Sequence, residues 1–298
     1  MKLNRRGFLA SGFGVLSSQL FASDKSIWRG QALGADISIS LPRQFESKFK
    51  ADLPVLFNLI EGIESIFSLY NANSTLSRLN QEGVLHQPPV EMIELLDQVA
   101  LIHKITNHHF DPTIQPLWEA WALGGDIDYG QSLIGFNKVL YDRQKIQFAD
   151  KEMALSFNGI VQGYMTDKVT DFLKKKGYSS ALVNMGEFSA ISDGWRIGIE
   201  NSDNELIHTQ TLDDCGIATS APFTMMLSNM SHILPVTPDV CKVQWKTVSV
   251  ASSSATIADG ISTGLVYMPY DDVLSVNRYP QIKSIVIETL EGEVIELT

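Results

Sequence analysis

The sequence predicts an α+β fold: one layered domain of mixed sheets and helices that follows an N-terminal export signal. Two observations support this class. Strand-like and helix-like segments follow one another without the regular alternation that a doubly wound parallel sheet requires. No internal repeat, low-complexity run or long Pro/Ser-rich linker divides the chain after the signal. We therefore expect a signal at residues 1–23 and a single domain at residues 24–298.

Charge and composition exclude some classes of partner. The formal net charge is −11 and the chain has no basic stripe, which argues against nucleic acid or an anionic membrane as the main partner. The apolar share of 44% is ordinary for a globular protein with a sizeable core. A small anionic ligand remains compatible with this charge, because it needs only one local positive site or a metal ion.

The first 23 residues, MKLNRRGFLASGFGVLSSQLFAS, have the organisation of an export signal. A basic start precedes a moderately apolar stretch, which Gly and Ser interrupt too often for a membrane span. Arg5 and Arg6, followed by GFL, resemble the twin-arginine signal of proteins that are exported already folded. We expect removal of roughly the first 22–25 residues and a periplasmic product without stable membrane insertion.

Hydrophobic periodicity predicts the first elements of the domain. Residues 31–41, QALGADISISL, alternate in the manner of a strand. Residues 45–69 carry helical periodicity, and a second helix begins after Pro88 and Pro89. The chain then reads strand, Gly-rich loop, helix and strand: ALSF (154–157), NGIVQG (158–163), YMTDKVTDFLKKK (164–176) and SSALVNM (179–185). Further strands are expected at 195–200, 247–251, 264–268 and 284–297, the last one broken by Gly292 as a hairpin.

Cysteine and histidine spacing gives no zinc site. The two cysteines, Cys215 and Cys241, either pair in an oxidising compartment or remain two buried thiols, and the sequence leaves both possibilities open. His108 and His109 are adjacent, and adjacent side chains diverge on most backbones. The sequence therefore does not predict that these two histidines share a metal.

The segment ATIADGISTGLV, residues 255–266, places Asp259 and Thr263 one turn apart on a helix made of small and apolar residues. In one interpretation Asp259 caps another element and Thr263 bonds back to its own helix. In the other interpretation the carboxylate and the hydroxyl are hard oxygen ligands for a cation such as Mg²⁺. The pair alone favours the first interpretation.

Four more segments carry polar or aromatic groups that suit a ligand site. The loop NGIVQG, with Gly159 and Gly163, opens a helix, where backbone N–H groups favour an anion. FDPTIQPLWEAW, from residue 110, is a rigid aromatic segment that suits the wall of a flat-ligand pocket. FSLYNANSTLSRLN, from residue 67, enters a polar turn at Tyr70. SHILPVTPD carries His232, whose neutral ring can act as a general base near pH 7. Each segment also has an ordinary structural explanation.

Taken in order, these segments resemble one family, the ApbE-type FAD:protein FMN transferases. The resemblance runs from LGADISI through FSLYNANSTLSRLN and FDPTIQPLWEAW. It is strongest at LSFNGIVQGYMTDKVTDFLKKKGYSSALVNMGE and continues through GIATSAP, the His232 loop and SSSATIADGISTGLVYM. Single motifs are unspecific, but their order and spacing together are specific.

The resemblance implies an α+β fold, FAD as substrate, and a Mg²⁺ ion held by Asp259, Thr263 and the carbonyl of Gly159. It implies transfer of FMN to a Thr or Ser hydroxyl of a partner flavoprotein domain, a subunit of a redox membrane complex, with release of AMP. The implied catalytic residues are His232 and Asp259. The implied FAD contacts are Tyr70, Asn71, Ser74, Trp118, Gly159, Gln162, Gly163, Asp167, Gly186, Glu187, Thr219 and Ser220.

Three departures from the family pattern leave rival functions open. Gln162 stands where the family usually has Lys, Ala221 follows Ala-Thr-Ser in place of Gly, and the His232 loop lacks the family's Asp. One rival is an FAD-binding carrier or maturation factor of the same fold without transfer activity. The other is an FAD pyrophosphatase, in which water replaces the protein hydroxyl and gives FMN and AMP.

Overall fold

The computed structural model describes residues 25–192, 194–227, 230–237 and 242–298. The expected export signal at residues 1–23 lies outside them, so its assignment stays a prediction. Within the described ranges, no helix combines the length and the apolar character that crossing a bilayer requires.

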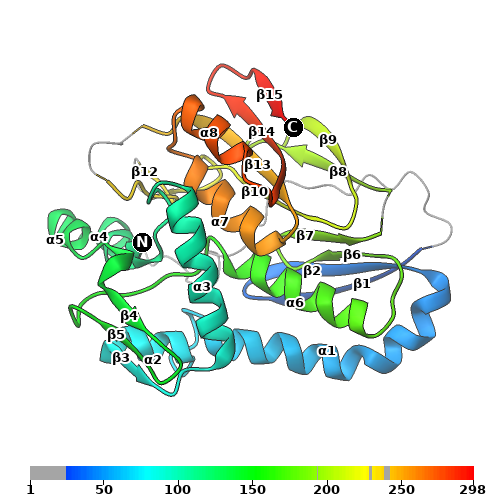
Figure 1. Ribbon diagram of the computed structural model, residues 1–298, viewed down its shortest axis with the longest axis horizontal. Coiled ribbons are helices and arrows are strands. Elements are labelled where there is room, and N and C mark those ends of the chain that lie inside the picture. The colour runs from blue at the N-terminus through cyan, green and yellow to red at the C-terminus, as the bar shows by residue number, and fades with distance from the viewer. Residues whose placement is uncertain (1–24, 193, 228–229, 238–241) are drawn as a thin grey trace.

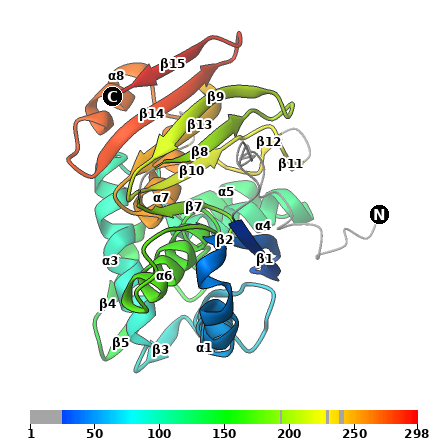
Figure 2. The ribbon, with the colours of Figure 1, turned by 90° about the vertical axis from the view of Figure 1, so that its right-hand side faces the viewer.

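An eight-stranded sheet forms the centre of the domain, and every neighbouring pair of strands in it is antiparallel. The strand order is β1-β2-β6-β7-β10-β13-β14-β15, so β1 and β15 are the two edges, which lie far apart in Figure 2. The strands are β1 (Lys25–Ala32), β2 (Ala35–Pro42), β6 (Ala181–Asn184), β7 (Phe188–Ile191), β10 (Gly216–Ser220), β13 (Trp245–Ser252), β14 (Ile282–Thr289) and β15 (Val294–Leu297).

Two helices cover one face of this sheet. Helix α6 (Val161–Lys175) packs on β6 and β7, and helix α7 (Ala255–Leu265) packs on β10, β13 and α6. Outside them lie α1 (Glu46–Phe67) against α6 and α3 (Val90–Ile105) against α7 (Figure 1). The remaining helices are α2 (Thr75–Glu82), α4 (Gln115–Leu123), α5 (Ile127–Ser132) and α8 (Tyr270–Asn277). The core therefore lies between the sheet and two helical layers.

A two-stranded hairpin, β8 (Trp195–Glu200) and β9 (Leu206–Leu212), covers the other face. Trp195, Ile197 and Ile199 of this hairpin pack with side chains of β6, β7 and β10. Cys215 is buried in the same cluster, whereas Cys241 lies outside the described residues, so their pairing remains open. The smaller sheets are β3 (Val84–His86), β5 (Lys145–Phe148) and β4 (Val139–Tyr141), and the short pair β11 (Met226–Leu227) and β12 (Met230–Ser231).

The structure confirms the predicted fold class and most predicted elements. Helices α1, α3 and α6 and the hairpin β14–β15 lie within a few residues of their predicted positions. Most of the predicted strand at residues 31–41 is strand β2, but a hairpin turn interrupts it, since Leu33 and Gly34 adopt positive φ values of 47° and 76° between β1 and β2.

Two predicted strands are absent. Residues 154–157 run between elements without pairing. The predicted strand at residues 264–268 is wrong, because α7 continues to Leu265 and a turn follows. A short apolar run fits a buried strand and the end of a buried helix equally well, and here packing on β10 and β13 selects the helix.

Candidate active site at the crossing of two helices

Helices α6 and α7 approach each other at Gly163. A Cβ atom placed on Gly163 would lie 2.3 Å from the carbonyl oxygen of Ala255, so only glycine permits this contact. The backbone N–H of Gly163 donates to Oδ2 of Asp259 over 2.9 Å. The crossing thus holds the Asp259 carboxylate, which is 5% exposed, at the N-terminal turn of α6.

The three predicted metal ligands come together at this crossing. Thr263 lies one helical turn after Asp259 on α7, and its hydroxyl donates to the carbonyl oxygen of Gly159 over 3.4 Å. Gly159 belongs to the turn that immediately precedes α6. A carboxylate, a hydroxyl and a backbone carbonyl are therefore presented by segments that lie about 100 residues apart in the chain.

A second carboxylate lies beside them. Glu187 ends the turn between β6 and β7, and its Oε2 accepts the N–H of Thr219 over 3.3 Å. Burial, together with the charge of Asp259, raises the pKa of Glu187 well above its usual range. Burial and the charge of Asp167 raise the pKa of Asp259 to about 7, although the N–H of Gly163 acts in the opposite direction.

These carboxylates lack a cationic partner among the described residues, since no Lys, Arg or His forms an ion pair with Asp259 or Glu187. A divalent cation would supply that missing charge. The donors are all hard oxygens, which suit Mg²⁺, and the described residues contain no cluster of three His, Cys, Asp or Glu for a softer metal. The residues at the crossing therefore fit the cation that the family resemblance implies.

A chain of hydroxyl groups ties the end of β10 to α7. Ser220 Oγ lies 2.8 Å from Ser262 Oγ and 3.5 Å from Thr263 Oγ1. Ser262 also donates to the carbonyl of Asp259 over 3.0 Å. Thr219 Oγ1, on the same strand, lies 2.9 Å from Ser249 Oγ of β13. Sequence reasoning missed Ser262, although it directly precedes Thr263.

The side chain of Gln162 lies over the turn between β6 and β7. Gly186 in that turn has φ 107°, and a Cβ placed on it would lie 2.5–2.8 Å from the side-chain amide of Gln162. The N–H of Gly186 donates to Asn184 Oδ1 over 3.0 Å. Gln162, Gly186 and Glu187 therefore stand together at one side of the crossing.

The predicted contacts from the polar turn before α2 divide into two groups. Tyr70 is exposed and reaches the turn before α6, where the side chain of Asn158 hydrogen-bonds its hydroxyl. Asn71 is also exposed, and its Oδ1 accepts the N–H of Asn73. Ser74 is fully buried and caps α2 through the N–H of Ser77, so its hydroxyl serves the helix, and a contact with FAD stays a prediction.

Asp167 has a clear structural partner. Its carboxylate accepts hydrogen bonds from Ser254 Oγ, Ala255 N, and Thr256 N and Oγ1, all at the N-terminus of α7. A carboxylate at this position is stabilised by the helix dipole and holds α7 against α6. The predicted contact of Asp167 with FAD therefore stays a prediction.

His232 and Trp118 belong to two different elements: His232 follows β12, and Trp118 lies in α4. His232 Nδ1 is 3.1 Å from the carbonyl of Met225, in the segment that follows β10. Burial lowers the pKa of His232, while the carbonyls of Met225 and Pro222 act against that shift. Trp118 of α4 packs in a small apolar cluster with Leu227, Leu234 and Met230, which surround the histidine in sequence.

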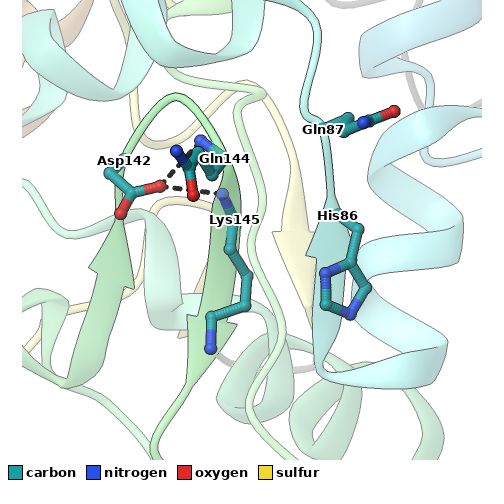
Figure 3. Close-up of a pocket in the computed structure, with 5 residues that line it drawn as sticks. All are labelled: His86, Gln87, Asp142, Gln144 and Lys145. Carbon is teal, nitrogen blue, oxygen red and sulfur yellow. Dashed lines mark hydrogen bonds between the residues drawn. The ribbon is translucent and has the colours of Figure 1, made fainter.

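A hollow in the described structure lies away from this crossing. It has a volume of about 620 Å³, is open to solvent and lies at one end of the β3-β5-β4 sheet (Figure 3). Its lining residues are His86, Gln87, Asp142, Gln144 and Lys145. The Asp142 carboxylate accepts the N–H groups of Gln144 and Lys145, so it is used to close the turn. None of the predicted site residues lines this hollow.

Comparison with known proteins gives one consistent result. The model of the ApbE family matches residues 33–286. An FAD:protein FMN transferase of Vibrio cholerae is 24% identical over 256 residues, which are 77% of this chain and 77% of that protein. One from Chlamydia pneumoniae is 24% identical over 281 residues, 85% of this chain and 83% of that protein.

Solved structures show the same fold. The flavin transferase ApbE from Vibrio cholerae superposes with a TM-score of 0.79 at 21% identity, covering 92% of this chain and 96% of that one. The apo form of the flavinyl transferase ApbE from Pseudomonas stutzeri gives a TM-score of 0.75 at 23% identity, with coverages of 93% and 95%. The layered arrangement of sheet and helices is therefore shared with these proteins.

Proposed function

This chain belongs to the ApbE family, and from that premise we propose that it transfers FMN from FAD to a Thr or Ser hydroxyl of a partner flavoprotein, with release of AMP. The observation that carries the proposal is the meeting of Asp259, Thr263 and the carbonyl of Gly159 at the crossing of α6 and α7. These donors suit Mg²⁺, and neither Asp259 nor the neighbouring Glu187 forms an ion pair with a cationic side chain among the described residues.

Each group at the crossing has a defined task in this proposal. Asp259, Thr263 and the Gly159 carbonyl would hold Mg²⁺, and the bound ion would supply positive charge against the pyrophosphate of FAD and against the charge that develops on the attacked phosphorus. The N–H of Gly163 fixes the orientation of the Asp259 carboxylate. The Ser220–Ser262 pair fixes the backbone of α7 on which both side-chain ligands stand.

The reaction forms one bond and breaks one bond. The acceptor oxygen bonds to the phosphorus of the FMN half, and the bond from that phosphorus to the AMP oxygen breaks, so AMP leaves with the bonding electrons. We propose His232 as the base that takes the hydroxyl proton, because burial lowers its pKa and keeps the ring neutral near pH 7. To accept this proton the ring must present one nitrogen to the substrate instead of to a backbone carbonyl.

A carrier without transfer activity is the second candidate, and Gln162 favours it. The family usually has Lys at this position, and a lysine ammonium would add positive charge beside the FAD phosphates. Glutamine offers only a dipole, and its amide already packs on Gly186. Such a carrier would bind FAD at the crossing and release no AMP.

The assay that tests the proposal uses the purified protein with FAD, Mg²⁺ and a threonine-bearing flavoprotein domain. A transferase releases AMP and raises the mass of the acceptor by one FMN. Release of FMN and AMP without a modified acceptor would identify a pyrophosphatase. Bound FAD without any released nucleotide would reject both enzyme assignments and leave the carrier.

Gln162→Lys is expected to tighten FAD binding or to speed transfer. Charge-assisted hydrogen bonds are about twice as strong as neutral ones, so we expect a gain of about 1–2 kcal/mol, or roughly tenfold. The matched control is Gln162→Met, which keeps the length of the side chain and adds no charge. The measurements are the FAD dissociation constant and the rate of AMP release. An equal effect of Lys and Met would show that charge at residue 162 has no influence.

We also propose that the chain reaches the periplasm by the twin-arginine route, which rests on Arg5 and Arg6 before a weakly apolar stretch. Replacing both arginines with lysine is expected to retain the precursor in the cytoplasm, because lysine keeps the charge and removes the recognised pair. Fractionation of the cells with an antibody against the domain measures the outcome. Unchanged export of the double variant would reject this route.

A further inference from the structure

Two histidines that are five residues apart meet at the C-terminal end of α3. His103 Nε2 lies 2.7 Å from His108 Nδ1, and the two rings are 4.4 Å apart between centroids, edge to face. His108 is exposed to solvent and His103 is partly buried. Among the described residues this pair is separate from the crossing of α6 and α7, because neither histidine contacts Asp259, Thr263 or Gly159 directly.

The backbone between the two rings is fixed. Asn107 and His108 both adopt positive φ values, 47° and 71°, which turn the chain back over the end of the helix. The N–H of His108 donates to the carbonyl of His103 over 2.8 Å, and the N–H of His109 donates to Thr106 over 2.9 Å. This strained turn, closed by its own hydrogen bonds, carries the His108 ring to the His103 ring.

The tautomer of His103 is also fixed. Its Nδ1 lies 2.7 Å from the carbonyl oxygen of Phe110, which accepts only from a protonated nitrogen. The lone pair of a neutral ring is then on Nε2, which faces His108. A histidine whose second nitrogen donates to a backbone carbonyl is the usual arrangement of a metal ligand in proteins. Asp111, with Oδ2 3.8 Å from the same Nδ1, adds negative charge on the far side of the ring.

We propose that His103 Nε2 and His108 Nδ1 form a two-imidazole site for a divalent transition-metal ion. Imidazole pairs suit Zn²⁺, Ni²⁺ and Cu²⁺, with Cu²⁺ the strongest, and bind Mg²⁺ poorly because it prefers oxygen. Zn–N bonds of 2.0–2.1 Å in a tetrahedral site place the two nitrogens about 3.3 Å apart. The two nitrogens are now 2.7 Å apart, and a small outward movement of the exposed His108 ring would give the larger separation. No third His, Cys, Asp or Glu joins the pair within the described ranges, so water completes the coordination.

The turn that carries the two histidines packs against α7, the helix that carries Asp259 and Thr263. Thr106 and Phe110 pack directly on Gly264, where a Cβ would lie 2.7 Å and 3.2 Å from their side chains. Gly264 follows Thr263 on α7. The proposed transition-metal site and the proposed Mg²⁺ site therefore use different donor atoms. The packing of Thr106 and Phe110 on Gly264 connects the two sites.

The test uses calorimetric titration of the tag-free protein with Zn²⁺ in the presence of millimolar Mg²⁺. We expect one Zn²⁺ per chain, and at least about tenfold weaker binding in His108→Ala, since even outer-shell partners of a ligand contribute 10–100-fold. The matched control is His109→Ala, because His109 is adjacent to His108 in the chain but forms no ring pair with the other described residues. This control is expected to bind Zn²⁺ as the unmodified chain does.

A second measurement keeps the test independent of folding. With Cu²⁺ as the probe, electron paramagnetic resonance should show two coordinated imidazole nitrogens in the unmodified chain and one in His108→Ala. Far-ultraviolet circular dichroism confirms that each variant is folded. Equal Zn²⁺ affinity of the unmodified chain, His108→Ala and His109→Ala would overturn the proposal. So would the absence of a two-nitrogen signal, which would reduce the pair to a hydrogen bond between two rings.

Discussion

Replacing Asp259 with asparagine is expected to abolish the proposed Mg²⁺-dependent release of AMP from FAD and to leave the fold intact. Asparagine keeps the shape and an oxygen that still accepts the N–H of Gly163, but it removes the only charged ligand among the three proposed ones. Loss of one preorganised electrostatic group in an active site typically lowers kcat by about 10²–10³-fold. We expect a loss of at least this size, measured as AMP released per minute at saturating FAD.

The same variant is expected to be more stable than the unmodified chain when no Mg²⁺ is present. The folded chain binds a proton at Asp259 up to about pH 7, whereas an unfolded chain releases it near the usual value of 3.8. Between these pH values the folded state holds more protons, so the free energy of unfolding falls as the pH rises. The full shift corresponds to a destabilisation on the order of 4 kcal/mol above pH 7, which asparagine removes.

Urea unfolding at pH 4 and pH 8, with and without Mg²⁺, measures this prediction. The variant should match the unmodified chain at pH 4 and exceed it at pH 8 without metal. Mg²⁺ should stabilise the unmodified chain at pH 8 and have no effect on the variant. Normal activity of Asp259→Asn, or an equal response of both proteins to Mg²⁺, would place the ion elsewhere.

Gly163→Ala is expected to destabilise the protein and to disrupt the site. The added Cβ would lie 2.3 Å from the carbonyl oxygen and 2.7 Å from the carbonyl carbon of Ala255, and neither backbone atom is free to move aside. Overpacking of this kind costs about 1–3 kcal/mol, and we expect the upper end of that range because α6 and α7 must separate. Separation moves Asp259 away from Gly159, so activity is lost as well.

Gly62→Ala is the matched control for this substitution. Gly62 lies in α1 on its exposed side, and no atom lies within 4 Å of a Cβ placed there. Alanine at an exposed helical position stabilises by about 0.5–1 kcal/mol relative to glycine, so the control should shift the urea midpoint in the opposite direction. Equal effects of the two substitutions would mean that the helix crossing is not tightly packed.

The fold class follows from local patterns and the proposed metal ligands follow from the family resemblance, but the first turn of α6 follows from neither. The glycines of NGIVQG predict a loop up to residue 163, whereas α6 begins at Val161. Glycine is required at residue 163 because α7 approaches the backbone there, and no turn depends on it. The sequence does not show this requirement, because it does not show which helix packs against residue 163. Residues 264–268 resemble a strand for a similar reason: the sequence does not show that Gly264 and Leu265 end a helix that packs on the sheet.

Contacts between residues that are far apart in the chain could not be predicted from the sequence. The carboxylate of Asp167 accepts hydrogen bonds from the N-terminus of α7, nearly 90 residues later in the chain. No pattern of sequence spacing predicts a contact of this kind. The His103–His108 pair depends on two consecutive residues with positive φ, which the sequence TNHH does not indicate. The resemblance to the family gave Asp259 and Thr263, because their spacing of four residues is a local property of one helix.

The distance along the chain between Gly159 and Thr263 has a consequence for the order of events during protein synthesis. The ribosome delivers the Gly159 turn, α6 and most of the sheet before it delivers α7, which starts at Ala255. A nascent chain that stops before α7 carries one of the three proposed metal ligands and lacks the partner of Gly163. Assembly of the proposed cation site therefore waits until translation is nearly complete.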